Sequence, residues 1–292
     1  MPVLALLLQA GNGCRRNEVP PSVDGAAAID LAARLVAFGK RCSGTEAYRR
    51  QADFIAAEAK AAGAEVVFQD FIQQTVKGEI LFRNIIAEVK GRSRQFVIVS
   101  AHCDVKDLGD SNFEGANDGA SGTALLLEMM QAIKRTGEKP PVTVRFVFFD
   151  GEECMVAYSE RDGLFGSSYY ADRMSAEEQR QCLGVINVDM IGDRDLHVTI
   201  PQNSDDRLSE LALEGAEESG LDTYFSRSPQ VILDDHVQFL KKGIPAVNLI
   251  DFNYGEANSY WHTDADAMDK ISGKSLEIVG EVVFFMIWNV KK

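Results

Sequence analysis

Four short apolar runs are the clearest structural signal along the chain. They consist mainly of β-branched, aliphatic and aromatic residues and span 96–102, 142–149, 183–188 and 246–250. Runs of this kind, without polar alternation, are typical of strands buried on both faces of a sheet. Between the first two, a helical pattern over 121–135 has one apolar face, made by Leu125, Leu126, Met129 and Ile133. This order predicts an α/β fold: one central, mixed but mostly parallel sheet with helices on both faces.

Weaker patterns predict the elements before the first run. Residues 29–38 and the alanine-rich stretch 46–62 have helical spacing, and the second helix is expected to stop at Gly63. Residues 65–71 and 80–89 alternate between polar and apolar side chains, as half-buried strands do.

The C-terminal apolar stretch bears on membranes. Its uncharged part, 282–290, has less than half of the roughly 20 residues that a spanning helix needs. We therefore expect it to be the buried face of a last helix, with no transmembrane segment. Because no Pro- or Gly-rich linker interrupts 25–243, residues 25–292 are expected to form a single domain.

Residues 1–24 allow two interpretations. The apolar stretch 3–8, followed by a glycine-rich turn and Cys14, fits a leader, in which case the protein would be exported, either periplasmic or lipid-anchored through Cys14. The positive n-region is missing and Asn12-Gly13 is a poor cleavage signal, which favours a flexible arm. The sequence leaves both open.

Charge and cysteine content narrow the possible partners. The chain has 292 residues, of which 46% are hydrophobic, and 44 acidic against 30 basic residues give a net charge of −14. Such a charge repels phosphates, and the chain has no basic run to override it, so nucleic-acid binding is not expected. Five cysteines, an odd number without metal-like spacing, predict no disulfide framework.

Polar residues with catalytic potential follow the buried runs. Ligands bind at the carboxyl ends of the strands in such sheets, and the residues expected there are His102, Asp104, Asp150, Glu152, Glu153 and Asp189. Histidine with aspartate or glutamate is the ligand set of catalytic zinc. Asp104 is placed to orient the His102 ring. Glu152 and Glu153 should point in opposite directions, so that one holds a metal while the other reaches a substrate proton.

Two further residues fit this chemistry and also have ordinary structural interpretations. Asp118 stands at the start of the helix expected over 121–135, where it is either a ligand or an N-cap. His262 lies far along the chain, in the segment Tyr-Trp-His-Thr-Asp at 260–264, where it is either a ligand or a structural histidine.

Five motifs, taken in order, resemble those of the co-catalytic zinc aminopeptidase superfamily. They are HCD at 102–104, GANDGASG at 115–122, FDGEE at 149–153, NVDM at 187–190 and WHTDAD at 261–266. Within that superfamily the chain is most similar to the animal-type glutaminyl cyclases, on the basis of the extra segment 154–163, the triplet DDH at 234–236 and Trp261. Two features depart from the cyclases: Asp118 lies in the peptidase form of its motif, and Asn248 stands where animal cyclases have histidine.

The resemblance implies roles for individual residues. The principal zinc would be held by Asp118, Glu153 and His262, and His102 and Asp189 would complete a second site, so that one or two zinc ions are expected. Glu152 would be the general acid–base, surrounded by a hydrogen-bonded acidic network of Asp189 and Asp234. The substrate pocket would be walled by Trp261, Tyr158 and Phe165, although ordinary core packing is an equal interpretation of the last two.

The resemblance also implies alternative activities. As a cyclase, the protein would act on peptides or proteins with a free N-terminal glutamine, form pyroglutamate and release ammonia. As a zinc aminopeptidase, it would use Glu152 to deprotonate a water and hydrolyse the first peptide bond. A metal-free relative would only bind peptides in the cleft. The motifs do not separate the two enzymes, since both reactions use the same residues.

Overall fold

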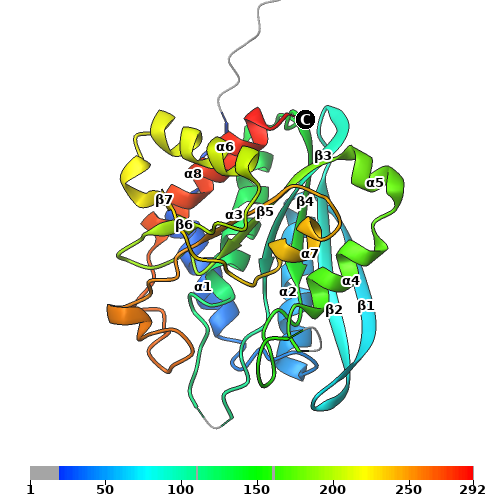
Figure 1. Cartoon of the computed structure of the whole chain (residues 1–292), viewed down its shortest axis with the longest axis vertical. Helices are drawn as coiled ribbons and strands as arrows, with labels where there is room; N and C mark the ends of the chain where they lie inside the picture. The colour runs from blue at the N-terminus through cyan, green and yellow to red at the C-terminus, as the bar shows by residue number, and fades with distance from the viewer. Residues whose placement is uncertain (1–19, 110, 160–161, 292) are drawn as a thin grey trace, which may run out of the picture.

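The computed structural model describes residues 20–109, 111–159 and 162–291. Its centre is an eight-stranded sheet in the order β1-β2-β4-β3-β5-β8-β6-β7 (Figure 1). The strands are β1 (Glu65–Thr75), β2 (Gly78–Val89), β3 (Ser93–His102), β4 (Val142–Phe149), β5 (Cys182–Asp189), β6 (Val198–Ile200), β7 (Phe225–Arg227) and β8 (Ala246–Ile250). Strands β4, β3, β5 and β8 are parallel to one another, whereas β1 and β2 form an antiparallel hairpin at one edge. The predicted mixed α/β sheet is confirmed.

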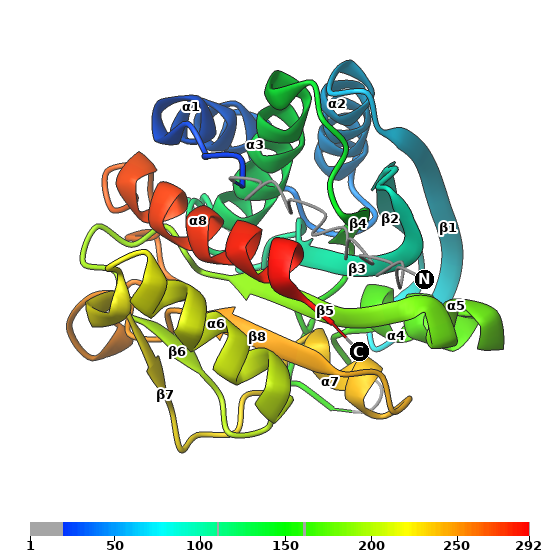
Figure 2. The same cartoon turned by 90° about the horizontal axis from the view of Figure 1, so that it is seen from above.

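Helices cover both faces of the sheet (Figure 2). One face carries α1 (Gly25–Val36), α2 (Glu46–Ala61), α3 (Ala120–Thr136) and α8 (Gly273–Asn289), with α6 (Asp206–Glu218) packed against α8. The other face carries α4 (Phe165–Arg173), α5 (Ala176–Gln181) and α7 (His236–Leu240). Two short 3-10 helices, η1 (Asp222–Tyr224) and η2 (Glu256–Asn258), lie in loops.

Strand β4 shows why the central strands read as unbroken apolar runs. Its alternate residues Val144, Phe146 and Phe148 belong to the core under α1, α2, α3 and α8. Its other residues Val147 and Phe149 pack in the second core, against α4 and α7. Because successive side chains of a strand point to opposite faces, a strand with a core on each side has few polar positions, and Arg145 in β4 is paired with Glu88 and Glu178.

The predicted elements lie close to their expected bounds. Strands β4 and β8 match the predicted ranges, and α2 ends at Ala61, with Gly63 in a left-handed conformation at φ +90°. The C-terminal apolar stretch is the second half of α8, and no helix in the described ranges is long and apolar enough to cross a membrane. The four cysteines among the described residues are free thiols. The predictions about a leader and Cys14 concern residues outside the described part of the chain.

Candidate active site

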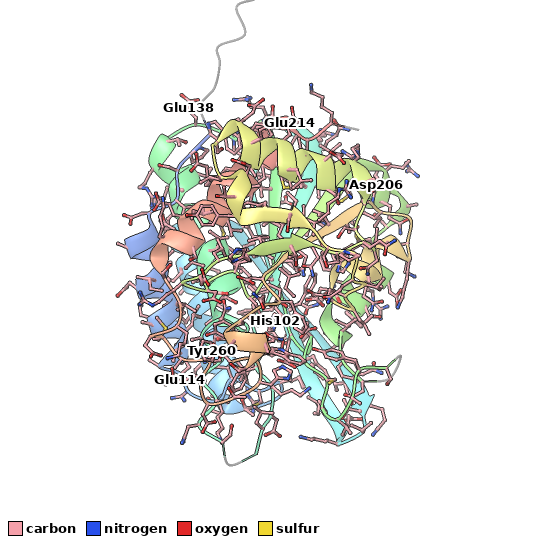
Figure 3. All side chains as sticks on the ribbon, turned by 60° about the vertical axis from the view of Figure 1, so that its left-hand side comes forward. His102, Glu114, Glu138, Asp206, Glu214 and Tyr260 are labelled. Carbon is pink, nitrogen blue, oxygen red and sulfur yellow. The ribbon has the colours of Figure 1, made fainter. Side chains whose placement is uncertain are left out.

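The candidate site lies where the parallel strands end. His102 and Asp189 are the last residues of β3 and β5, and Glu152 and Glu153 follow β4 after a short turn. Asp118 lies in the loop before α3, and His262 comes from the segment after β8. His102 lies inside the molecule, in the same region as the loop that carries Tyr260 (Figure 3). The fold thus gathers, at one edge of the sheet, residues that are up to 160 positions apart in sequence.

Two sets of donor atoms share one aspartate. Nε2 of His102 lies 3.2 Å from Oδ1 of Asp118 and 3.1 Å from Oδ1 of Asp189. Nε2 of His262 lies 3.3 Å from Oδ2 of Asp118 and 2.9 Å from Oε1 of Glu153. Within each set the donor atoms lie within 4.8 Å of one another. The two oxygens of Asp118 therefore face one set each.

The donor atoms suit a metal ion better than a structural role. Asp118 is 3% exposed, and its Oδ2 accepts no hydrogen bond from any described residue. Its side chain makes no capping bond to α3, so its interpretation as an N-cap is wrong. Buried carboxylate oxygens without partners are costly, whereas imidazole nitrogens and carboxylate oxygens together are the usual ligands of zinc.

Without a metal, the two histidines balance the charge of Asp118. Burial raises the pKa of Asp118, but the imidazoles of His102 and His262 beside it outweigh burial and leave this pKa below its usual range. Burial lowers the pKa of His262, but Asp118 and Glu153 outweigh it and raise this pKa to about 9. Burial lowers the pKa of His102, but Asp104, Asp118 and Asp189 outweigh it and raise this pKa well above its usual value. The carboxylates thus favour positive charge at both imidazoles, as they would favour a divalent cation.

Two buried aspartates support the backbone of the site. Asp104 accepts hydrogen bonds from the backbone N–H groups of Glu152 at 3.2 Å and Glu153 at 3.3 Å. Its Oδ1 also lies 3.7 Å from Nδ1 of His102, an ion-pair contact longer than a hydrogen bond, so Asp104 fixes the two glutamates and also borders the histidine ring. Asp266 accepts from the backbone of Asn117 at 2.7 Å and Asp118 at 3.1 Å. Sequence reasoning missed this role of Asp266, although its motif contained the residue.

Glu152 and Glu153 face a common space rather than opposite sides. The hydroxyl of Tyr158 donates to Oε1 and Oε2 of Glu152, each at 3.0 Å, and lies 3.5 Å from Oε2 of Glu153. The expectation of opposite directions fails because the backbone turns at Gly151, at φ +75°, and is not extended here. Burial, and then the nearby charges of Glu153 and Asp234, raise the pKa of Glu152.

The predicted hydrogen-bonded network of Asp189 and Asp234 around Glu152 is not what the structure shows. Asp189 bonds to His102, whereas Asp234 accepts from the side-chain amides of Asn187 at 3.0 Å and Asn248 at 2.6 Å. The acidic groups act on one another through charge instead. Burial and the charge of Asp189 raise the pKa of Asp234 to about 7.

The three predicted pocket aromatics divide into two groups. Trp261 is half-buried and stacks on the His262 ring with centroids 4.1 Å apart, and Tyr158 reaches Glu152, so both border the site. Phe165 is buried against Phe82, with ring centroids 5.0 Å apart, and belongs to a core cluster. For Phe165 the structure thus supports core packing. Phe113, which the sequence did not single out, meets the His262 ring edge-on at 6.1 Å.

Comparisons with known proteins agree with this geometry. The family described as peptidase family M28 matches residues 84–287. The bovine glutaminyl-peptide cyclotransferase is 27% identical over 248 residues, which cover 73% of this chain and 67% of that protein. The chain spans about two thirds of the length of the animal cyclotransferases that it matches.

Two solved structures are similar over nearly the whole chain. A glutaminyl cyclase from an Acidobacteriales bacterium is 31% identical, with a TM-score of 0.87, and covers 93% of this chain and 96% of that one. A Zn-dependent exopeptidase from Parabacteroides distasonis is 27% identical, with a TM-score of 0.82, and covers 93% of this chain and 100% of that one. Cyclases and exopeptidases are thus both among the proteins that share this fold.

Proposed function

The chain belongs to peptidase family M28, and from that premise we propose that it is a zinc-dependent glutaminyl-peptide cyclotransferase. Its substrates would be peptides or proteins with a free N-terminal glutamine. The observation that carries the proposal is the position of Tyr158, which belongs to the segment that the sequence relates to the cyclases: its side chain contacts Glu152 at the edge of the site. The likeness to the bacterial glutaminyl cyclase supports the same conclusion.

The residues present fit a zinc ion, which Asp118, Glu153 and His262 would hold. When bound, zinc would supply a Lewis acid that polarises the γ-carbonyl of the substrate glutamine. Trp261, stacked on the His262 ring, would form an apolar wall beside that carbonyl. Because the attacking amine belongs to the same glutamine as the carbonyl, the main contribution of the chain is to hold the two groups in contact.

Glu152 would move the proton. In the reaction the α-nitrogen forms a bond to the side-chain carbonyl carbon, and the bond from that carbon to the amide nitrogen breaks. The Glu152 carboxylate would accept the proton that the α-amine loses and donate it to the departing nitrogen, which leaves as ammonia. Tyr158 holds both oxygens of Glu152 and keeps them directed into the shared space.

A second candidate function is that of a zinc aminopeptidase. The observation that favours it is the second donor set, in which His102 and Asp189 lie against the other oxygen of Asp118. These residues would hold a second ion beside the first, as two-metal hydrolases do. The likeness to the Zn-dependent exopeptidase from Parabacteroides distasonis supports this second candidate.

One experiment separates these functions. The zinc-loaded protein is given a dipeptide amide that begins with glutamine, followed by ammonia release, and in parallel a panel of Leu, Ala and Met arylamides. Ammonia release without arylamine release is expected. Arylamine release alone would replace the cyclase with the aminopeptidase, and inactivity in both assays with zinc bound would favour a peptide-binding relative.

Removing the Tyr158 hydroxyl should slow the reaction without unfolding the protein. A hydrogen bond to a charged group contributes about 1.5–3 kcal/mol, so Tyr158→Phe is expected to lower kcat by about 10- to 100-fold. The measurement is steady-state ammonia release at saturating zinc. Tyr224→Phe, at an exposed tyrosine outside the site, is the matched control. An unchanged kcat in Tyr158→Phe would show that Tyr158 serves only as packing.

A further inference from the structure

Four polar side chains form a continuous hydrogen-bonded row through the interior of the sheet. The Ser100 hydroxyl in β3 donates to Oδ1 of Asn187 in β5 at 2.7 Å. The Asn187 amide donates to Oδ1 of Asn248 in β8 at 3.1 Å and to Oδ1 of Asp234 at 3.0 Å. The Asn248 amide donates to Oδ2 of Asp234 at 2.6 Å. All four residues are at most 2% exposed.

Strand register puts the row in one layer. Ser100 is paired with Asn187 across β3 and β5, and Asn187 with Asn248 across β5 and β8. Residues paired in this way point to the same face of the sheet. The strand neighbours of these three residues are all buried and apolar: Val99, Ala101, Ile186, Val188, Val247 and Leu249. Apolar side chains at the three positions would therefore suit the core, whereas each polar side chain there needs a hydrogen-bond partner.

The bonds define one orientation for each amide. Because the Ser100 hydroxyl donates to the Asn187 oxygen, the nitrogen of Asn187 must point along the row toward Asn248 and Asp234. The oxygen of Asn248 is occupied by Asn187, so its nitrogen also points to Asp234. Both oxygens of Asp234 thus receive a neutral donor, one from each asparagine.

We propose that Asn187 and Asn248, oriented by Ser100, are positioning residues that hold the Asp234 carboxylate in place relative to Glu152. The row begins at β3 and ends on the Asp234 carboxylate. Its middle member, Asn187, lies two residues before Asp189 in β5 and on the same face of the strand, and Asp189 contacts His102 in the site at 3.1 Å. Side-chain amides do not titrate, so both donors are kept on either side of the Asp234 pKa of about 7. The inference rests on the proposed function, since it concerns the same acid–base group.

Kinetics of the zinc-loaded enzyme test the proposal. Asn248→Asp keeps the shape of the side chain but turns the donor that faces Asp234 into an acceptor, and should lower kcat by about 100-fold, the effect of misplacing a reacting group by about 1 Å. Ser100→Ala removes only the far end of the row and should lower kcat by about tenfold with KM unchanged. Ser100→Thr, which restores the hydroxyl, should recover it.

The control is a buried hydroxyl at the opposite end of the sheet. Thr143 bonds to the backbone of Ser93 and Gly91, outside the row. Thr143→Val should lower stability as Ser100→Ala does and leave kcat unchanged. If Ser100→Ala keeps the kcat of the wild type, or loses activity only in proportion to its loss of stability, the proposal is overturned. Ser100→Ala also decides the matter if Asn248→Asp does not fold.

A measurement without turnover separates this inference from the proposed function. A wild type that releases no ammonia contradicts the cyclase proposal but leaves the row to be tested. In spectra of the protein with ¹⁵N-labelled asparagine, the side-chain amide resonances of Asn187 and Asn248 should move in Asp234→Asn and in Ser100→Ala. Unmoved resonances would show that the row does not transmit orientation to Asp234, whatever the activity of the protein.

Discussion

Replacing Glu152 with glutamine is expected to lower kcat for ammonia release by about 100- to 10,000-fold, the usual contribution of a positioned acid–base group. Glutamine keeps the length of the side chain and still accepts from Tyr158, but its amide nitrogen does not take up the proton of the substrate amine. The change should leave zinc binding intact, because the metal ligand of the pair is Glu153, whose Oε1 faces His262 at 2.9 Å.

The matched control for this variant is Glu128→Gln. Glu128 is also a buried glutamate, 1% exposed, and accepts from the backbone of Asp24 at 3.0 Å and from the Arg135 side chain at 2.5 Å, outside both donor sets. It should keep full activity, which separates the loss of a base from the loss of a buried charge. Steady-state kinetics and zinc content by mass spectrometry are measured on both variants. A Glu152→Gln protein that binds zinc and turns over at the wild-type rate would remove Glu152 from the mechanism.

The strand ends were predictable because of the way a buried parallel sheet is built. A strand with a core on each face is mostly apolar, and the polar residues inside it, such as Arg145 in β4, are paired, so the polar residues that follow the run mark its carboxyl end. His102 and Asp189 follow this rule, and in the structure Nε2 of His102 lies 3.1 Å from Oδ1 of Asp189. The sequence therefore predicted which residues meet at the edge of the sheet, although they are separated by 87 positions.

The parts that were not predictable depend on the path of loops. The common direction of Glu152 and Glu153 follows from the turn at Gly151, where an added Cβ would lie 2.5 Å from the Phe82 ring. The partners of Asp234 depend on the register between β5 and β8, which places Asn187 beside Asn248. Neither the turn at Gly151 nor this register can be predicted from the spacing of apolar residues along the chain. An asparagine within an apolar strand was the available signal, since a buried amide needs a partner.

The second large effect is expected at His262. The His262 ring contacts both Asp118 and Glu153. Losing a residue that only supports a metal ligand already lowers metal affinity by about 10- to 100-fold, so His262→Ala should weaken zinc binding by more than about 100-fold. Activity at low zinc should disappear and return only partly when zinc is added. His197→Ala is the control, because the His197 ring bonds to the backbone oxygen of Asp195, at 3.1 Å, and belongs to neither donor set.

Measuring zinc binding and activity in the same way on His102→Ala determines how many zinc ions the site needs. His102 touches Asp118 and Asp189 but belongs to the other donor set. If the cyclase works with one ion, His102→Ala should keep one tightly bound zinc per chain and most of its kcat, whereas His262→Ala loses both. If the wild type binds two ions and His102→Ala loses one of them together with its activity, the pair of ions is part of the reaction. That result would favour the aminopeptidase, since Asp118 offers one oxygen to each set.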